Sequence, residues 1–205
     1  MVVGSGRRAR TAPHIVLFDH AQPQAGRDTL KEFADDERAY ETANAWVPWL
    51  QLARAAHWRM RGDYAAARAE YANCLQNHDS AASTRGQFWP KATAGMIETL
   101  SELAEFQEAR LLGETALAEC EQHGIGMLSH GIARALALVE GRLEAYDQAA
   151  RRIERVIAEQ LAYGVAGLQL GASYEARARI GIWAADADAI EKFGRLTAQV
   201  YRHGR

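Results

Sequence analysis

One helical motif recurs along the 205-residue chain, and its repetition constrains the fold more than any other feature. Its landmark is an alanine at positions 67, 109, 149 and 189, so successive copies are 42, 40 and 40 residues apart. Three copies cover residues 62–75, 104–117 and 144–157, and a weaker fourth contains Ala189, Phe193 and Leu196. Such a period predicts stacked helical units, each packing on its neighbours.

Each copy predicts one helix, because its apolar residues are spaced by three or four. The alanine is expected where this helix crosses a partner, since a larger side chain would push the two axes apart. Pro48 and Pro90 are expected near helix starts and Gly62 at a helix end. The partner is the segment before each copy, so first helices are expected over about 45–61, 87–103, 128–143 and 168–183. Short connections make the helices of each pair antiparallel.

Composition narrows the class of protein. Apolar residues make up 48% and charged residues 24%, which is ordinary for a soluble globular chain. The 26 acidic and 24 basic residues leave a net charge of −2, so no strong field attracts a nucleic acid or an anionic membrane. No apolar run approaches the roughly 20 residues that span a bilayer, and no signal peptide is evident. We therefore expect a cytoplasmic protein.

The pattern of Gly62-Asp63-Tyr64, Ala67, Tyr71 and a small residue before leucine resembles the second half of a tetratricopeptide repeat. The period of 40 to 42 is longer than the standard one and is closer to the repeats of MalT-like regulators and the helical tails of bacterial signalling ATPases and Ser/Thr kinases. This resemblance implies an all-α fold, a right-handed α-α superhelix (a TPR-like solenoid) of about four and a half helix pairs.

The half pair would come first, because Gly26, Leu30 and Phe33 keep the motif's spacing one period before Ala67. Residues 1–13 are expected to be a flexible tail, and residues 14–205 the repeat domain. The first repeat begins inside its first helix, near His14, and the chain stops soon after the last second helix. Because solenoid ends normally carry capping helices, we expect either a repeat tail of a longer protein or self-association through uncapped terminal helices.

No pattern in the sequence supports catalysis. None of the seven histidines forms an i, i+4 pair, and Cys74 and Cys120 belong to no CxxC motif. Gly4-Ser5-Gly6 lacks the lysine that completes a phosphate-binding loop. We expect no enzyme activity, no metal and no cofactor, and two buried structural thiols.

Binding residues are sought on the first helices, which line the concave face in the tetratricopeptide family. Trp58 and Trp183 are expected in the core, whereas Trp49 and Trp89 fit either core or groove. The candidates for the concave groove are Trp49, Arg59, Lys91, Glu98, Arg134 and Tyr174. Their mixture of charges and aromatic rings suits an amphipathic or acidic peptide.

These observations predict a non-catalytic protein–protein interaction scaffold of a bacterial signalling or regulatory system. The alternative is a sensor domain that binds a small molecule or signal peptide in the groove. The expected partner is a protein or peptide, with no nucleic acid and no membrane.

Overall fold

The computed structural model describes residues 47–77 and 82–202, and every regular element within these ranges is a helix. In chain order they are α3 (Val47–Met60), α4 (Tyr64–Asn77), α5 (Ala82–Glu102), α6 (Phe106–Gln122), the 3₁₀ turn η2 (Met127–Ser129), α7 (His130–Arg142), α8 (Tyr146–Ala162), α9 (Leu168–Ala184) and α10 (Ala187–Tyr201). The all-α class is therefore confirmed for the described ranges. The tail 1–13 and the half-copy around Gly26, Leu30 and Phe33 lie outside them.

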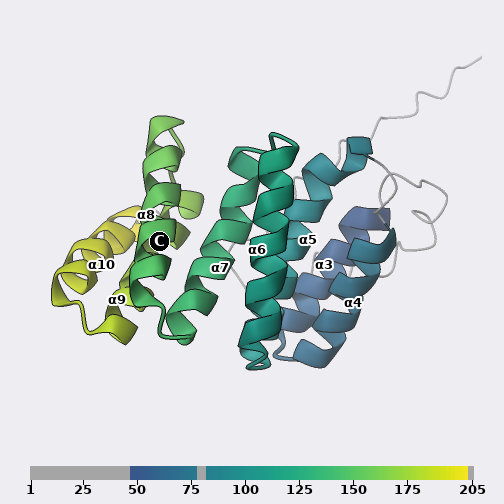
Figure 1. Ribbon diagram of the computed structural model, residues 1–205, viewed down its shortest axis with the longest axis horizontal. Helices are drawn as coiled ribbons and strands as arrows, with labels where there is room; N and C mark the ends of the chain where they lie inside the picture. The colour runs from purple at the N-terminus through teal and green to yellow at the C-terminus, as the bar shows by residue number, and fades with distance from the viewer. Residues whose placement is uncertain (1–46, 78–81, 203–205) are drawn as a thin grey trace, which may run out of the picture.

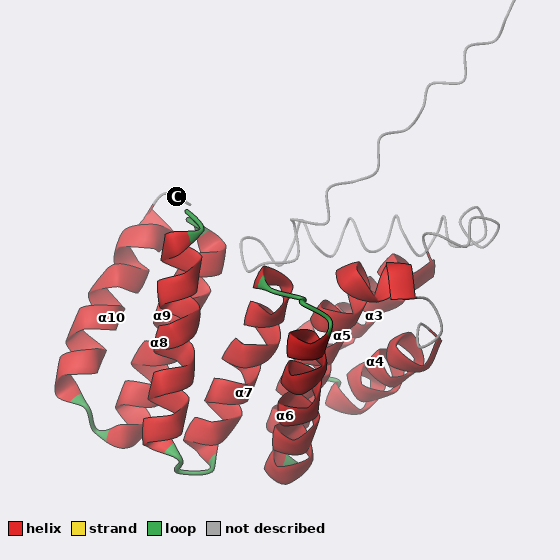
Figure 2. Ribbon diagram, turned by 45° about the horizontal axis from the view of Figure 1, so that its top comes forward, coloured by secondary structure: helices red, strands yellow, loops and turns green. Residues whose placement is uncertain are grey.

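The helices pack as four successive pairs. Each first helix packs against its own second helix, α3 on α4, α5 on α6, α7 on α8 and α9 on α10, and each second helix also packs on the next first helix. Figure 1 shows the pairs following one another in chain order, from α3 and α4 at one end to α9 and α10 at the other. Figure 2 shows how short the loops are that reverse the chain. Of the helices in the described ranges, none has the length and hydrophobicity that crossing a bilayer requires.

The landmark alanines are buried in this arrangement. Ala67, Ala109 and Ala149 are fully buried, and Ala189 is 4% exposed. The residue four positions later is also buried in every copy, although its size varies from glycine to tyrosine: Tyr71, Gly113, Ile153 and Phe193. All four alanines are therefore buried, as contact with a partner helix requires, and their place at the helix crossings stays a prediction.

All four turns between paired helices have one geometry, in which a residue with positive φ follows the first helix. The residue is Gly62 in the first pair, and Ala104, Glu144 and Ala185 in the others. The next backbone N–H donates to the carbonyl five residues earlier, as from Asp63 to Trp58 at 3.0 Å and from Ala145 to Glu140 at 2.9 Å. These are Schellman turns, which satisfy carbonyl groups at a helix end. Gly62 ends its helix as predicted.

The start of α5 corrects one prediction. The first helix of this pair was expected over 87–103 with Pro90 near its start, but α5 begins at Ala82 and contains Pro90 in its interior. A proline costs least in the first turn, so sequence reasoning placed the start beside it. The other first helices begin and end within two residues of the expected positions.

Two core clusters run through the described pairs. One joins α3 to α7 through residues such as Leu52, Tyr71, Ile97 and Val139. The other joins α7 to α10 and contains Ile153, Tyr174, Ile180 and Phe193. Helix α7 contributes to both, so the pairs form one packed series rather than separate bundles.

Candidate functional site

The four first helices form a continuous layer, because α3 packs on α5, α5 on α7 and α7 on α9. The six residues predicted to bind a partner all belong to this layer. Four of them meet as two couples between α3 and α5. The Lys91 ammonium lies 5.6 Å from the centre of the Trp49 ring, and the Arg59 guanidinium contacts the Glu98 carboxylate at 2.7 Å. The layer therefore satisfies part of its own charge.

The Arg59 guanidinium of this ion pair also interacts with the buried phenol of Tyr71. Tyr71 of α4 is 2% exposed, and burial raises its pKa to about 12, although Arg59 opposes the shift. Burial alone lowers the pKa of the Arg59 guanidinium, but Glu98 and Tyr71 outweigh that effect and leave it raised. The Tyr71 ring lies against Gly95 of α5, where an added Cβ would come within 2.3 Å of Cζ. This cluster fixes the packing of α3, α4 and α5.

The other two predicted residues differ from each other. Arg134 of α7 is half-buried, and no carboxylate of the described residues lies within ion-pair distance of it. Tyr174 of α9 is only 7% exposed and packs on Phe193, with ring centres 6.1 Å apart. Its expected place in an open groove is wrong, because the ring fills the space between α9 and α10.

The four described tryptophans are all partly buried, whereas the sequence predicted two in the core and two in either core or groove. Trp49, Trp58 and Trp89 are partly buried against the first core cluster, and Trp183 against the second. Trp46 lies outside the described residues. None of the four is wholly in the core, so each indole leaves part of its surface accessible, as amphipathic rings commonly do.

A second group of side chains joins α7 to α9, and sequence reasoning missed most of it. The Arg142 guanidinium lies 5.8 Å from the Trp183 ring centre and 5.2 Å from that of Phe106. Arg179 lies 5.6 Å from the same Trp183 ring. Along α7, Arg134, Leu138 and Arg142 recur every fourth residue and share one side of the helix. Along α9, Arg179, Ile182 and Trp183 also share one side.

We call these six residues the α7–α9 face: Arg134, Leu138, Arg142, Arg179, Ile182 and Trp183. Their spacing is visible in the sequence, so the periodicity of arginines was the signal that could have found them. The spacing of Arg179 and Trp183 also predicts their contact, because residues four apart on a helix are neighbours. What the sequence does not contain is the contact of Arg142 with the same indole, which depends on how α7 and α9 are placed side by side.

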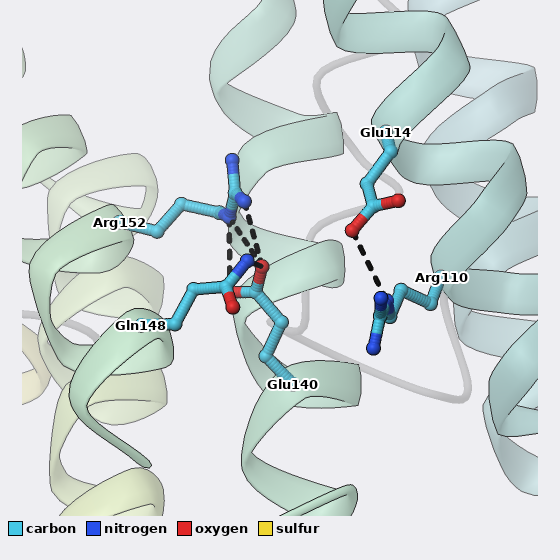
Figure 3. Close-up of polar contacts among 5 residues, drawn as sticks. All are labelled: Arg110, Glu114, Glu140, Gln148 and Arg152. Carbon is cyan, nitrogen blue, oxygen red and sulfur yellow. Dashed lines mark hydrogen bonds and ion pairs between the residues drawn. The ribbon is translucent and has the colours of Figure 1, made fainter. Parts of the chain in front are cut away.

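Ion pairs elsewhere join the helices without making a reactive site. Glu140 of α7 is 1% exposed, and its carboxylate accepts hydrogen bonds from Arg152 Nη2 at 2.6 Å and Gln148 Nε2 at 2.7 Å (Figure 3). Figure 3 also shows Arg110 paired with Glu114 one turn along α6. Both oxygens of this buried carboxylate accept hydrogen bonds, so its charge is compensated within the protein.

The histidines and cysteines of the described ranges are dispersed. His130 is buried and its Nε2 lies 2.9 Å from the Glu159 carboxylate, whereas His123 is exposed. Cys74 and Cys120 are buried free thiols, as predicted, and burial raises the pKa of each to about 11. In the part of the chain that the structure describes, no three His, Cys, Asp or Glu side chains gather as metal ligands would.

The α3–α5 couples and the α7–α9 face together place charged and aromatic side chains on all four first helices, and we call this set the row. What this row does is argued from its own chemistry. No protein-family model, no curated protein and no solved structure matches this chain.

Proposed function

We propose that this chain is a TPR-like solenoid that serves as a non-catalytic scaffold for protein–protein interaction in a bacterial signalling or regulatory system of the cytoplasm. The observation that carries the proposal is the row of side chains along the packed first helices α3, α5, α7 and α9. A surface of this kind combines tryptophan and arginine, the residue types that most often anchor protein interfaces.

The row has the extent that an interface requires. Neighbouring packed helices are about 8–10 Å apart, so four first helices present a surface roughly 30 Å wide. A stable interface needs about 800 Å² on each partner, which a surface of this width supplies. The geometry suits an extended or helical segment laid across the first helices.

Charge reversal on this surface tests the proposal. Affinity capture from the native host would compare the wild-type chain with Lys91→Glu/Arg134→Glu, which reverses two charges on α5 and α7. The matched control is Arg151→Glu/Arg155→Glu, which makes the same charge change at exposed positions of the second helix α8. We expect the first variant to lose the proteins that the wild type and the control both retain.

Two results would count against the scaffold. If the control loses the same proteins as the first-helix variant, net charge rather than the row of first helices governs capture. If the first-helix variant, shown to be folded by circular dichroism, retains every protein, partners bind elsewhere.

A further inference from the structure

The α7–α9 face holds two arginines against one tryptophan. Arg142 and Arg179 lie 5.8 and 5.6 Å from the Trp183 ring centre, within the range of a cation–π contact. Arg142 contacts the Phe106 ring as well, at 5.2 Å. These contacts with aromatic rings restrain the guanidinium groups, while their N–H groups have donors left for another acceptor.

The arginines of this face are among the eight, of fourteen with described side chains, that contact no carboxylate of a described residue. Arginines at six positions contact the carboxylate of a described residue: 54, 59, 68, 110, 152 and 177. Among the described residues, no Asp or Glu lies within ion-pair distance of Arg134, Arg142 or Arg179. The nearest acidic residues of the same helices have other partners. Glu140 is bound by Arg152, and Glu175 accepts a hydrogen bond from the Tyr201 hydroxyl. Three cations of this face are therefore not neutralised from within the described structure.

The Trp183 indole packs against the backbone of α7 at Gly141. Gly141 has no side chain, and a Cβ there would lie 2.7 Å from Cε3 and 2.9 Å from Cζ3 of Trp183. Real Cβ atoms do not approach so closely, so the ring position depends on glycine at 141. The arrangement of ring and guanidinium groups is built before any ligand arrives, which lowers the entropy cost of binding.

Apolar surface lies beside the charge. Ile182, next to Trp183 on α9, is 61% exposed, and Leu138 lies between Arg134 and Arg142 on α7 with part of its surface accessible. A ligand that matches the face carries carboxylates for the planar guanidinium donors and at least one apolar side chain for Ile182 and Leu138.

We propose that the α7–α9 face binds an acidic peptide segment of a partner protein, with Arg142 and Arg179 as the carboxylate-binding residues. This inference rests on the proposed scaffold function and names the chemistry of the partner. Charge complementarity selects the occupant, because three cations without described counter-ions favour an acidic segment over a neutral or basic one.

The test measures fluorescence anisotropy with a fluorescein-labelled peptide of Glu-Glu-Leu repeats and the full chain. We expect saturable binding that weakens as salt is added, and none to the same peptide with Gln for Glu. Arg142→Gln/Arg179→Gln should weaken binding by at least about tenfold, since two charge-assisted contacts are lost. The matched control Arg151→Gln/Arg155→Gln on α8 should change it by less than about twofold.

A charge-preserving variant separates the guanidinium geometry from a general positive field. Arg142→Lys/Arg179→Lys keeps both charges and removes the planar fork, so binding should still fall by about threefold or more. Circular dichroism and urea unfolding of each variant show whether it is folded. If Arg142→Gln/Arg179→Gln is unfolded, the lysine variant decides instead.

Several outcomes overturn the inference. Equal losses from the α7–α9 variant and the α8 control show that binding follows net charge alone. Full binding by the lysine variant removes the role of the guanidinium groups. Binding to phosphatidylserine vesicles without binding to the peptide shows that the face recognises a membrane surface.

If the peptide fails to bind while the capture experiment still depends on Lys91 and Arg134, the scaffold stands and the acidic partner is wrong. If the peptide binds as described but capture does not depend on the first helices, the scaffold is wrong and the carboxylate site remains.

Discussion

Three residues take a backbone conformation that L-amino acids avoid. Ala104, Glu144 and Ala185 have φ between 54° and 62°, in the turns where the first pair uses Gly62 at 77°. The left-handed conformation costs a residue with a Cβ about 1–2 kcal/mol. The helix-pair geometry imposes this conformation regardless of the residue, because the Schellman hydrogen bonds form in all four turns.

Glycine at such a position should therefore stabilise the chain. Glu144 is exposed, so Glu144→Gly removes the strain and loses little contact, and we expect a gain of about 0.5–1 kcal/mol in the free energy of unfolding. Gly62→Ala should cost about 1 kcal/mol by the same reasoning. Urea unfolding at neutral pH measures both, and a loss of stability in Glu144→Gly would contradict the assignment of strain.

The contact between Tyr71 and Gly95 makes a second prediction at this scale. An alanine at 95 would place its Cβ within 2.3 Å of the Tyr71 ring, and overpacking of this kind costs about 1–3 kcal/mol. The matched control is Gly131→Ala on α7, where the Cβ would lie 3.6 Å from Ala94 Cβ, an ordinary contact. We expect Gly95→Ala to lower the urea midpoint and Gly131→Ala to leave it unchanged or raise it. Equal effects would show that the ring moves away freely.

The buried phenol also makes stability depend on alkaline pH. Its pKa rises from the ordinary 10.0 to about 12 in the folded chain, so the folded state keeps a proton that the unfolded state releases. The resulting stabilisation is present below pH 10 and is lost as pH rises through 12, by about 3 kcal/mol in all. The thiols of Cys74 and Cys120, with pKa values raised to about 11, act in the same direction. Urea unfolding between about pH 9 and pH 12 should show a smaller decline in Tyr71→Phe than in the wild type, and identical declines would show that Tyr71 titrates normally.

At the scale of helices, α7 and α8 are joined by an ion pair that has no counterpart at the equivalent place in α5. Glu140 occupies the position that Leu100 takes in α5, as the matching turn hydrogen bonds show. Leu100 is buried with nothing to pair, whereas Glu140 needs Arg152 to compensate its charge. A buried pair contributes little net stability, but loss of one member is expensive.

Arg152→Met should therefore destabilise the chain by about 3 kcal/mol or more, since it leaves a carboxylate that is 1% exposed without its cation. The double variant Glu140→Leu/Arg152→Met places a leucine at 140, as at the equivalent Leu100 of α5, and should recover most of the lost stability. Urea unfolding of both variants measures the difference. A double variant as unstable as the single one would show that Arg152 acts through packing rather than charge.

The existence and order of these helices could be predicted from the sequence, because alanine spacing and turn residues are local signals. The start of α5 could not, since Pro90 lies in a helix interior where packing overrides its cost. The positive φ values in the other three turns could not be predicted either, because alanine and glutamate, unlike Gly62, do not indicate a left-handed conformation.

At the scale of the whole molecule, the candidate site was harder to predict than the fold. Periodicity placed Arg59, Lys91, Glu98 and Arg134 on the first helices. It did not show that Arg59 pairs with Glu98 or that Lys91 lies over the Trp49 ring. The prediction for Tyr174 was wrong because its side of α9 is covered by α10, the second helix of the same pair. Trp183 was expected in the core, and its contact with Arg142 depends on the packing of α7 on α9.

The central claim is that partners bind along the first helices, and hydroxyl-radical footprinting of the chain with a captured partner tests it most directly. The predicted result is protection of Trp49, Trp183 and Ile182 on the first helices, with exposed side chains elsewhere, Leu111 of α6 and Leu161 of α8, oxidised as in the free chain. Protection of Leu111 and Leu161 with Trp183 and Ile182 still oxidised would contradict the account.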